Sequence, residues 1–184
     1  MDGVYDGSWE QTGSEPGQAL KIFNLRFDTF VHPVKRVPLR ATVLQTPPWC
    51  NMIALTPDNR MVLVRQFRFG VRQVTLEIPG GMVDPGEDHG TAVRRELQEE
   101  TGYTSDDWTY LGACQQNPAF HDDLCHLWLA KDVRKTHEIS GDGMEHIEVV
   151  LMKPEDVIQA VHDGRFMHAH AIVALSRVYD LRIT

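Results

Sequence analysis

A run of acidic residues near the middle of the chain has the composition of a divalent-cation site. Glu96, Glu99 and Glu100 lie in the stretch Arg94–Glu100. On an α-helix their side chains would fall within an arc of roughly 100°. Two carboxylates about 5 Å apart repel by ~3 kcal/mol at an effective dielectric of 20. Arg95 can offset one charge, and a hard cation with oxygen ligands would offset the others. For such a run taken alone, the alternative is a solvated acidic helix face.

The stretch that must position these carboxylates is predicted to be a loop followed by a helix. Residues 80–87 are glycine, proline, acids and few apolar side chains, which favour turns. Asp88 suits the N-cap, because its carboxylate can accept hydrogen bonds from the free amides of the first turn. Gly102 suits a left-handed C-terminal stop. Between them, Val93 and Leu97 would face the core while the neighbouring stripe is anionic.

The full spacing of this stretch is more specific than its parts. It reads G-x5-E-x7-R-E-U-x-E-E-x-G-U, with U an apolar residue, at Gly81, Glu87, Arg95, Glu96, Leu97, Glu99, Glu100, Gly102 and Tyr103. This pattern resembles the signature of the Nudix hydrolases, metal-dependent enzymes that cleave a nucleoside diphosphate linked to another group. The resemblance covers roughly residues 50–184 and implies an α/β/α sandwich with a mixed sheet.

The resemblance also implies a ligand set for Mg2+, with Mn2+ as the alternative ion. The ligands would be three carboxylates and one backbone carbonyl, those of Glu96, Glu99, Glu100 and Gly80. Glu96 and Glu100 are one helical turn apart, which agrees with carboxylates that reach the same ions. Glu100 and Arg95 would be catalytic, Arg95 through its pairing with Glu99. Glu87 would orient the site rather than bind the ion.

The base that removes a proton from the attacking water is expected outside the signature. Glu145 lies in residues 141–149, which resemble the G-D-G-x-E-x-I-E-V region of ADP-ribose pyrophosphatases. In those enzymes the first of the two glutamates is the general base. Glu148 is the alternative. On a continuous strand the two side chains would point to opposite faces, so both cannot enter one cavity without a bulge.

Substrate contacts are predicted from one proline, two cations and one aromatic. Pro118 lies 16 residues after Gly102, the spacing that the resemblance associates with ADP-ribose and related nucleoside diphosphate sugar pyrophosphatases. The guanidinium groups of Arg65 and Arg68 suit phosphate oxygens, although surface arginines are the ordinary alternative. Arg68 matches a substrate-contacting arginine of the family. An adenine base would stack on an aromatic side chain, and the candidates are Trp49, Trp9, Phe23 and Phe27.

Length and composition limit the domain organisation and the kinds of binding partner. The chain has 184 residues, of which 42% are hydrophobic, and a formal charge of −8. This suits an α+β protein with residues 1–46 as a tail and small antiparallel sheet and residues 47–184 as the Nudix domain. The tail is expected to be loose over residues 1–19. By resemblance, the N-terminal strands would form a homodimer. The negative charge argues against nucleic-acid or anionic-membrane binding.

The remaining patterns predict a cytoplasmic protein without a second metal site. Neither a membrane-spanning apolar run nor a signal-peptide pattern is visible. The three cysteines are far apart in sequence, which favours reduced thiols over a disulfide framework or a zinc motif. In a helix, His168 and His170 would point about 200° apart, so capping or surface placement is expected of both.

The predicted activity is metal-dependent hydrolysis of the diphosphate bond of ADP-ribose or a related nucleoside diphosphate sugar. The products would be a nucleoside monophosphate and a sugar phosphate. One alternative is a Nudix hydrolase of GDP-mannose, a dinucleotide or an RNA 5′ end. Another is a sensor that binds ADP-ribose without cleaving it. The intact acidic cluster disfavours the sensor, because binding alone does not require three repelling carboxylates.

Overall fold

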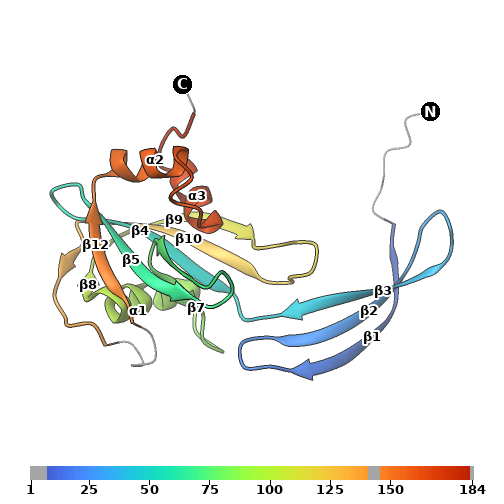
Figure 1. Ribbon diagram of the computed structural model, residues 1–184. Coiled ribbons are helices and arrows are strands. Elements are labelled where there is room, and N and C mark those ends of the chain that lie inside the picture. The colour runs from blue at the N-terminus through green and yellow to red at the C-terminus, as the bar shows by residue number, and fades with distance from the viewer. Residues whose placement is uncertain (1–7, 141–145, 183–184) are drawn as a thin grey trace. The chain divides into compact units, whose positions relative to one another are not determined.

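The structure is a computed structural model that describes residues 8–140 and 146–182 (Figure 1). The chain forms two compact units. The smaller unit contains residues 1–47 and 115–123, and the larger contains residues 48–114 and 124–184. Whether these units are separate domains with a boundary near residue 47 stays a prediction.

The smaller unit is built on an antiparallel sheet with the strand order β1-β2-β3. Its strands are β1 (Glu10–Ala19), β2 (Asn24–Val31) and β3 (Pro38–Gln45). The small N-terminal sheet is therefore confirmed. Residues 115–123 belong to the same unit, since the Leu44 amide donates to the Phe120 carbonyl at 2.7 Å. Arg26 also pairs with Asp122 at 2.8 Å.

The expectation of a loose tail is wrong for residues 10–19, which form β1. Nearly all of its side chains are exposed, so β1 lacks the apolar alternation by which a strand is predicted. Its backbone pairs with β2, and the Ser14 hydroxyl donates to Asp28 at 2.7 Å. A Cβ on Gly17 would lie 2.7 Å from Cβ of Leu25, so glycine allows this close pairing. Residues 1–7 lie outside the described chain.

The larger unit is built on a seven-stranded sheet with the central order β12-β5-β4-β10-β9, in which β6 pairs with β5 and β7 with β4. β10 runs parallel to β4, whereas β5 and β7 run antiparallel to it, so the sheet is mixed. The strands are β4 (Trp49–Leu55), β5 (Met61–Arg68), β6 (Gln73–Glu77), β7 (Gly80–Met82), β9 (Asp107–Gln115), β10 (Leu124–Lys131) and β12 (Glu148–Met152). A separate two-stranded ladder joins β8 (Tyr103–Thr104) to β11 (Arg134–Lys135).

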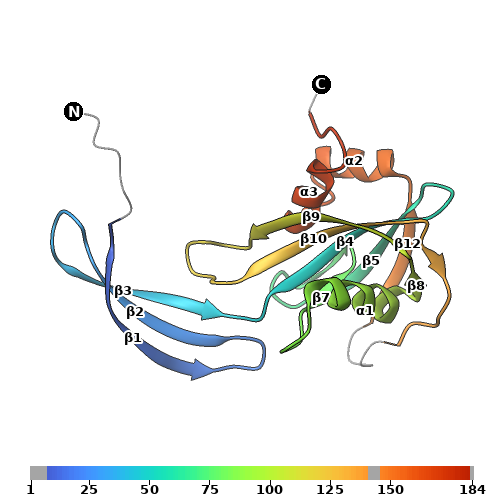
Figure 2. The same cartoon turned by 180° about the vertical axis from the view of Figure 1, so that it is seen from behind.

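Helices cover both faces of this sheet (Figure 2). α1 (His89–Thr101) packs on one face against Cys50 and Met52 of β4, and α2 (Pro154–His162) and α3 (Ala169–Ser176) pack on the other against Ile53. Alternate residues of β4 thus supply the two cores, as a strand buried on both sides requires. The predicted α/β/α sandwich is confirmed.

The ends of α1 are those predicted from the sequence. Oδ1 of Asp88 accepts hydrogen bonds from the amides of Gly90 and Thr91 at 2.9 and 3.1 Å. Gly102 has φ of 75°, and its amide donates to the Gln98 carbonyl at 2.8 Å. The helix that carries the carboxylates therefore has well-defined ends.

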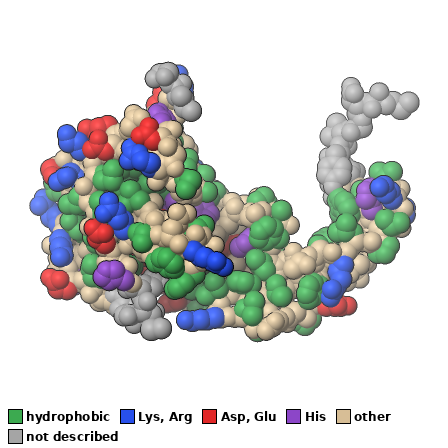
Figure 3. Space-filling view, in the orientation of Figure 1, with side chains coloured by type: hydrophobic (Ala, Val, Ile, Leu, Met, Phe, Trp, Pro, Cys, Tyr) green, Lys and Arg blue, Asp and Glu red, His purple; other side chains and the backbone are tan. Residues whose placement is uncertain are grey.

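The surface of the larger unit carries charged side chains of both signs (Figure 3). In this view, acidic and basic side chains of its described residues are interspersed. Among the described residues, none of the helices has the length and apolar character needed to cross a bilayer.

Candidate active site

Arg95 connects the signature loop to the acidic face of α1. Its Nε and Nη2 donate to the two oxygens of Glu87 at 3.2 and 3.0 Å. Its Nη1 donates to Glu96 at 2.8 Å and to Glu99 at 3.1 Å. Nη2 also reaches the Met82 carbonyl at 3.1 Å. The planar guanidinium group of Arg95 therefore holds three carboxylates and the end of β7 in place. Its contacts include the expected Arg95–Glu99 pair.

Two glycines let the loop backbone approach the other side of the cluster. A Cβ on Gly81 would lie 2.3 Å from Cδ of Glu96, so only glycine fits without displacing that carboxylate. The Gly80 amide donates to Oε2 of Glu100 at 3.0 Å, and a Cβ there would lie 2.2 Å from Nδ2 of Asn51. Thus the structure brings together Gly80, Glu96 and Glu100, which the sequence assigned to one metal site.

The cluster is partly withdrawn from water. Glu100 is 7% exposed. Burial raises the pKa of Glu96, although Arg95 acts in the opposite direction. Hydrogen bonds from Arg95 hold the pKa of Glu87 below its usual value. Arg95 therefore stabilises the ionised form of Glu87, and at Glu96 it only partly offsets the effect of burial.

The residues at this site fit Mg2+ or Mn2+. Their donors are carboxylate oxygens and a backbone carbonyl, which are the ligands that hard divalent ions take. The missing Cβ of Gly81 leaves the Glu96 carboxylate room beside the loop. The assignment of Glu96, Glu99, Glu100 and Gly80 as ligands stays a prediction.

The two predicted substrate arginines both have carboxylate partners. Arg68 makes a bidentate pair with Glu77, at 2.9 and 2.8 Å. Glu77 is 4% exposed and also accepts from the Thr75 hydroxyl at 2.6 Å. Burial raises the pKa of Glu77, but the contacts with Arg68, His168 and Thr75 together outweigh it, and the pKa lies below its usual value. Arg65 faces Glu148 across β5 and β12 in a looser pair of 3.4 Å.

The two histidines of the H-x-H pattern have different surroundings. His168 is the N-cap residue of α3, but its side chain caps nothing and is mostly buried, 3.6 Å from Glu77. Burial lowers the pKa of His168 to about 4. With Arg68 and Met167 it lines a cavity of about 380 Å3. His170 is half-buried near two cysteines. His168 thus occupies the N-cap position without capping the helix, and both side chains are partly buried.

The remaining predicted residues are Trp49, Pro118 and Glu145. Trp49 begins β4 and packs on the core beneath α2 and α3, the sheet face opposite α1. Pro118 lies in the smaller unit, in a turn where the Asn117 carbonyl accepts from the His121 amide at 2.8 Å. Glu145 lies outside the described residues. The substrate and base roles of all three stay predictions.

Asn51 is a structural residue that the sequence analysis missed. Its Nδ2 donates to the Pro79 carbonyl at 3.2 Å, beside Gly80, and its Oδ1 accepts from the Cys125 thiol at 3.2 Å. The available signal was a polar residue within the buried apolar run of β4. Buried amides need partners, so Asn51 ties β4 and β10 to the start of the signature loop.

Comparison with known proteins identifies the family of the chain. The chain is 30% identical to an ADP-ribose pyrophosphatase of Bacillus subtilis (strain 168) and 29% identical to a methanol dehydrogenase activator of Bacillus methanolicus. Each match spans 134 residues, 72% of either chain. The crystal structure of an ADP compounds hydrolase superposes with a TM-score of 0.81 at 21% identity, over 92% of this chain and 91% of that one, which shows the fold. The NUDIX domain family matches residues 48–173. The chain therefore belongs to the NUDIX domain family.

Proposed function

We propose that this protein hydrolyses the diphosphate bond of ADP-ribose or a related nucleoside diphosphate sugar. The products are a nucleoside monophosphate and a sugar phosphate. The observation that carries the proposal is the acidic cluster of α1, which Arg95 and the Gly80 amide hold against the signature loop. The similarity to a Bacillus subtilis ADP-ribose pyrophosphatase supports this substrate class.

Glu96, Glu99, Glu100 and the Gly80 carbonyl are the proposed ligands for Mg2+, with Mn2+ as the alternative. When bound, the ion supplies positive charge to the diphosphate oxygens and makes water more acidic. Arg95 keeps Glu96 and Glu99 in place while they bear negative charge. Because the ligands are anchored beforehand, little reorganisation is needed when the substrate arrives.

Glu145 is the proposed general base, and Glu148 is the alternative. The base takes a proton from the water that attacks phosphorus, which contributes about 10²–10⁴-fold in rate in enzymes of this kind. Glu148 is 59% exposed and pairs with Arg65 at the start of β12. That existing partner supports Glu145 over Glu148.

The diphosphate also needs contacts with side chains. Arg68 and Arg65 are the proposed cations, and Pro118 and Trp49 the proposed sugar and base contacts. Arg68 is held rigidly by Glu77, so any hydrogen bond that it makes to phosphate would cost little conformational entropy.

Two further proposals concern the protein in the cell. We place it in the cytoplasm. We also propose a homodimer formed through the sheet of β1, β2 and β3. The edge strand β1 of this sheet has mostly exposed side chains, which supports the proposal. Light scattering tests the assembly: the mass of one chain in solution would contradict it.

The function is tested by release of nucleoside monophosphate from ADP-ribose, other ADP-sugars, GDP-mannose and a dinucleotide, and by release of pyrophosphate or phosphate from a 5′-triphosphorylated RNA. Each substrate is assayed with and without Mg2+. Glu100→Gln should lower turnover by several orders of magnitude while circular dichroism stays unchanged. Glu155→Gln, an exposed acid of α2, is the matched control and should keep full activity.

Each alternative gives a different result in this assay. Preference for GDP-mannose would identify that compound as the substrate. It is the compound named for one relative, the GDP-mannose pyrophosphatase of Cronobacter sakazakii, which is 27% identical. Tight binding of ADP-ribose with no turnover would favour the sensor. Full activity of Glu100→Gln would rule out the metal assignment.

A further inference from the structure

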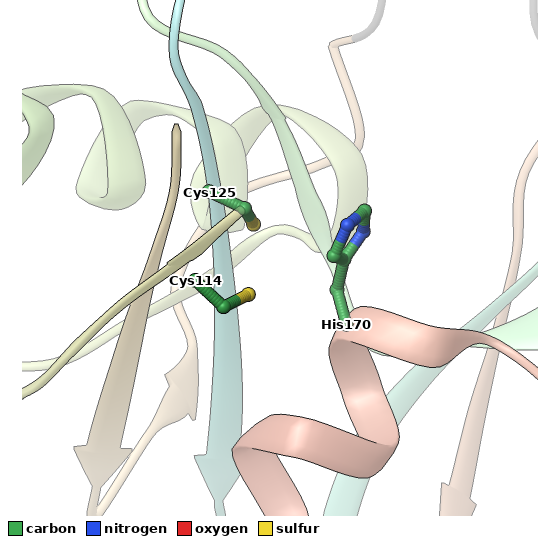
Figure 4. Close-up of side chains that lie close together, drawn as sticks. All are labelled: Cys114, Cys125 and His170. Atoms are coloured by element: carbon green, nitrogen blue, oxygen red, sulfur yellow. The ribbon is translucent and has the colours of Figure 1, made fainter. Parts of the chain in front are cut away.

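Two cysteines and a histidine from three elements of the larger unit meet away from the acidic cluster. Cys114 lies on β9, Cys125 on β10 and His170 in the first turn of α3. Their two Sγ atoms and a ring nitrogen all lie within 4.8 Å of one another. Figure 4 shows both sulfur atoms directed towards the space beside the His170 ring. In residues 8–140 and 146–182, no other group of three His, Cys, Asp or Glu residues has this spacing.

The donor set differs in kind from that of the α1 carboxylates. Thiolate and imidazole are soft or borderline ligands that favour Zn2+ over Mg2+. With Zn–S bonds of about 2.3 Å and a Zn–N bond of about 2.1 Å, ligands on one tetrahedral ion lie roughly 3.5–3.8 Å apart. The three side chains therefore need to close by only about 1 Å. Three protein ligands would leave the fourth position to water, as in zinc sites of the open type.

The surroundings suit a bound ion that carries thiolate ligands. Cys125 is fully buried, while Cys114 and His170 are half-buried, so the group borders the core yet has a path to solvent. Arg177 donates to the carbonyls of Leu111 and Ala113 at 2.7 and 3.0 Å, which holds its guanidinium beside Cys114. Arg177 thus places a fixed positive charge beside one of the two sulfur atoms.

We propose that Cys114, Cys125 and His170 bind one Zn2+ ion. The site lies on the sheet face covered by α3, whereas Glu96 and Glu100 lie on α1 at the opposite face. Zinc there would cross-link β9, β10 and the start of α3. Binding of ions at the two sites can be measured independently.

The test is metal titration of the reduced full-length protein in excess Mg2+, which occupies the oxygen ligands. Co2+ serves as the spectroscopic probe, because thiolate coordination produces sulfur-to-cobalt charge-transfer absorption. Zn2+ should then displace Co2+ with a stoichiometry of one. Cys114→Ser and His170→Gln should each weaken Zn2+ binding by about 100-fold or more, since loss of even an outer partner costs 10–100-fold.

Two matched variants separate ligand loss from general damage. Cys50→Ala removes the third cysteine, which is buried in the core beneath α1, and His168→Gln removes the other histidine of the H-x-H pattern. Both should keep the charge-transfer band and the Zn2+ affinity. Thermal melting of every variant checks folding. Absence of the band in the reduced wild-type protein would overturn the proposal, as would wild-type affinity in both Cys114→Ser and His170→Gln. Joining of Cys114 to Cys125 by a disulfide in air, without metal binding in the reduced protein, would also overturn it.

Discussion

The carboxylate of Glu96 lies directly against the backbone of Gly81. A Cβ at position 81 would come 2.3 Å from Cδ of Glu96 and 2.4 Å from its Oε1. A proposed metal ligand and a loop glycine therefore depend on each other sterically. Gly81 does not have a positive φ. Glycine is therefore needed here because it lets the Glu96 side chain approach the backbone, and not because of a left-handed backbone conformation.

Gly81→Ala should consequently displace the Glu96 carboxylate. A shift of about 1 Å in a catalytic group can cost roughly 100-fold in rate, and we expect that loss in kcat/KM for ADP-ribose. Gly70→Ala is the matched control, since a Cβ at Gly70 meets no atom within 4 Å. Steady-state kinetics and thermal melting of both variants measure the effect. Equal activity of the two variants would mean that Glu96 need not stay where it is.

Arg95 should not be replaceable by lysine. Arg95 makes hydrogen bonds to Glu87, Glu96 and Glu99 in one plane, whereas a lysine offers a point charge that cannot reproduce this fork. Arg95→Lys should lower kcat by about 100-fold with the fold intact, because the carboxylates lose their common anchor.

The control for Arg95 is its neighbour on the same helix. Arg94 donates to the Gly90 carbonyl and lies 5.0 Å above the Trp108 ring, away from the carboxylates. Arg94→Lys should retain nearly full activity in the same assay. Equal loss of activity in both lysine variants would show that the effect is not specific to the contacts of Arg95.

Stability should fall on acidification because of His168. Its pKa is lowered from 6.5 to about 4 by burial, despite the opposing effect of nearby Glu77. The unfolded chain therefore takes up a proton here at a higher pH than the folded chain does. The resulting stability is complete above pH 6.5 and is lost as the pH falls towards 4, by about 2 kcal/mol between pH 7 and pH 5.

Urea unfolding at pH 7 and pH 5 measures this contribution when the wild-type protein is compared with His168→Gln. The variant should lose about 2 kcal/mol less than the wild type over that interval, since glutamine does not titrate. Its other acids and histidines are unchanged, which makes the difference specific. A His168→Gln protein with the wild-type pH dependence would show that the pKa of His168 is the same in the folded and unfolded chains.

The signature helix was predictable because its information is local. Asp88 and Gly102 bound it through hydrogen bonds within a few residues, and its apolar and acidic stripes follow from the helical repeat. β1 was not predictable in this way. Its polar sequence carries no apolar alternation, and its backbone hydrogen bonds depend on β2, which begins at Asn24.

For the candidate site too, the residues of the local motif were predictable but the contacts between elements were not. The resemblance supplied Glu96 and Glu100, but the contact of Gly81 with Glu96 appears only when β7 and α1 are placed together. Likewise, the approach of Cys114 and Cys125 to His170 joins residues far apart in sequence, so no short motif reports it. Packing between elements, rather than local propensity, determines such clusters.

The two candidate bases can be separated by the same substitution at each position. Glu148 already pairs with Arg65 at 3.4 Å, and both side chains are about half exposed or more. Exposed pairs of this kind contribute little to stability, so Glu148→Gln should change kcat less than about threefold and leave the fold intact. Glu145→Gln should lower kcat by about 10²–10⁴-fold, the usual contribution of a general base.

The pH dependence of kcat distinguishes a base from a binding group, because loss of the base also removes the acidic limb of the profile. The reverse pattern, with a large loss for Glu148→Gln and none for Glu145→Gln, would assign the base to β12 and require Arg65 to release it during the reaction.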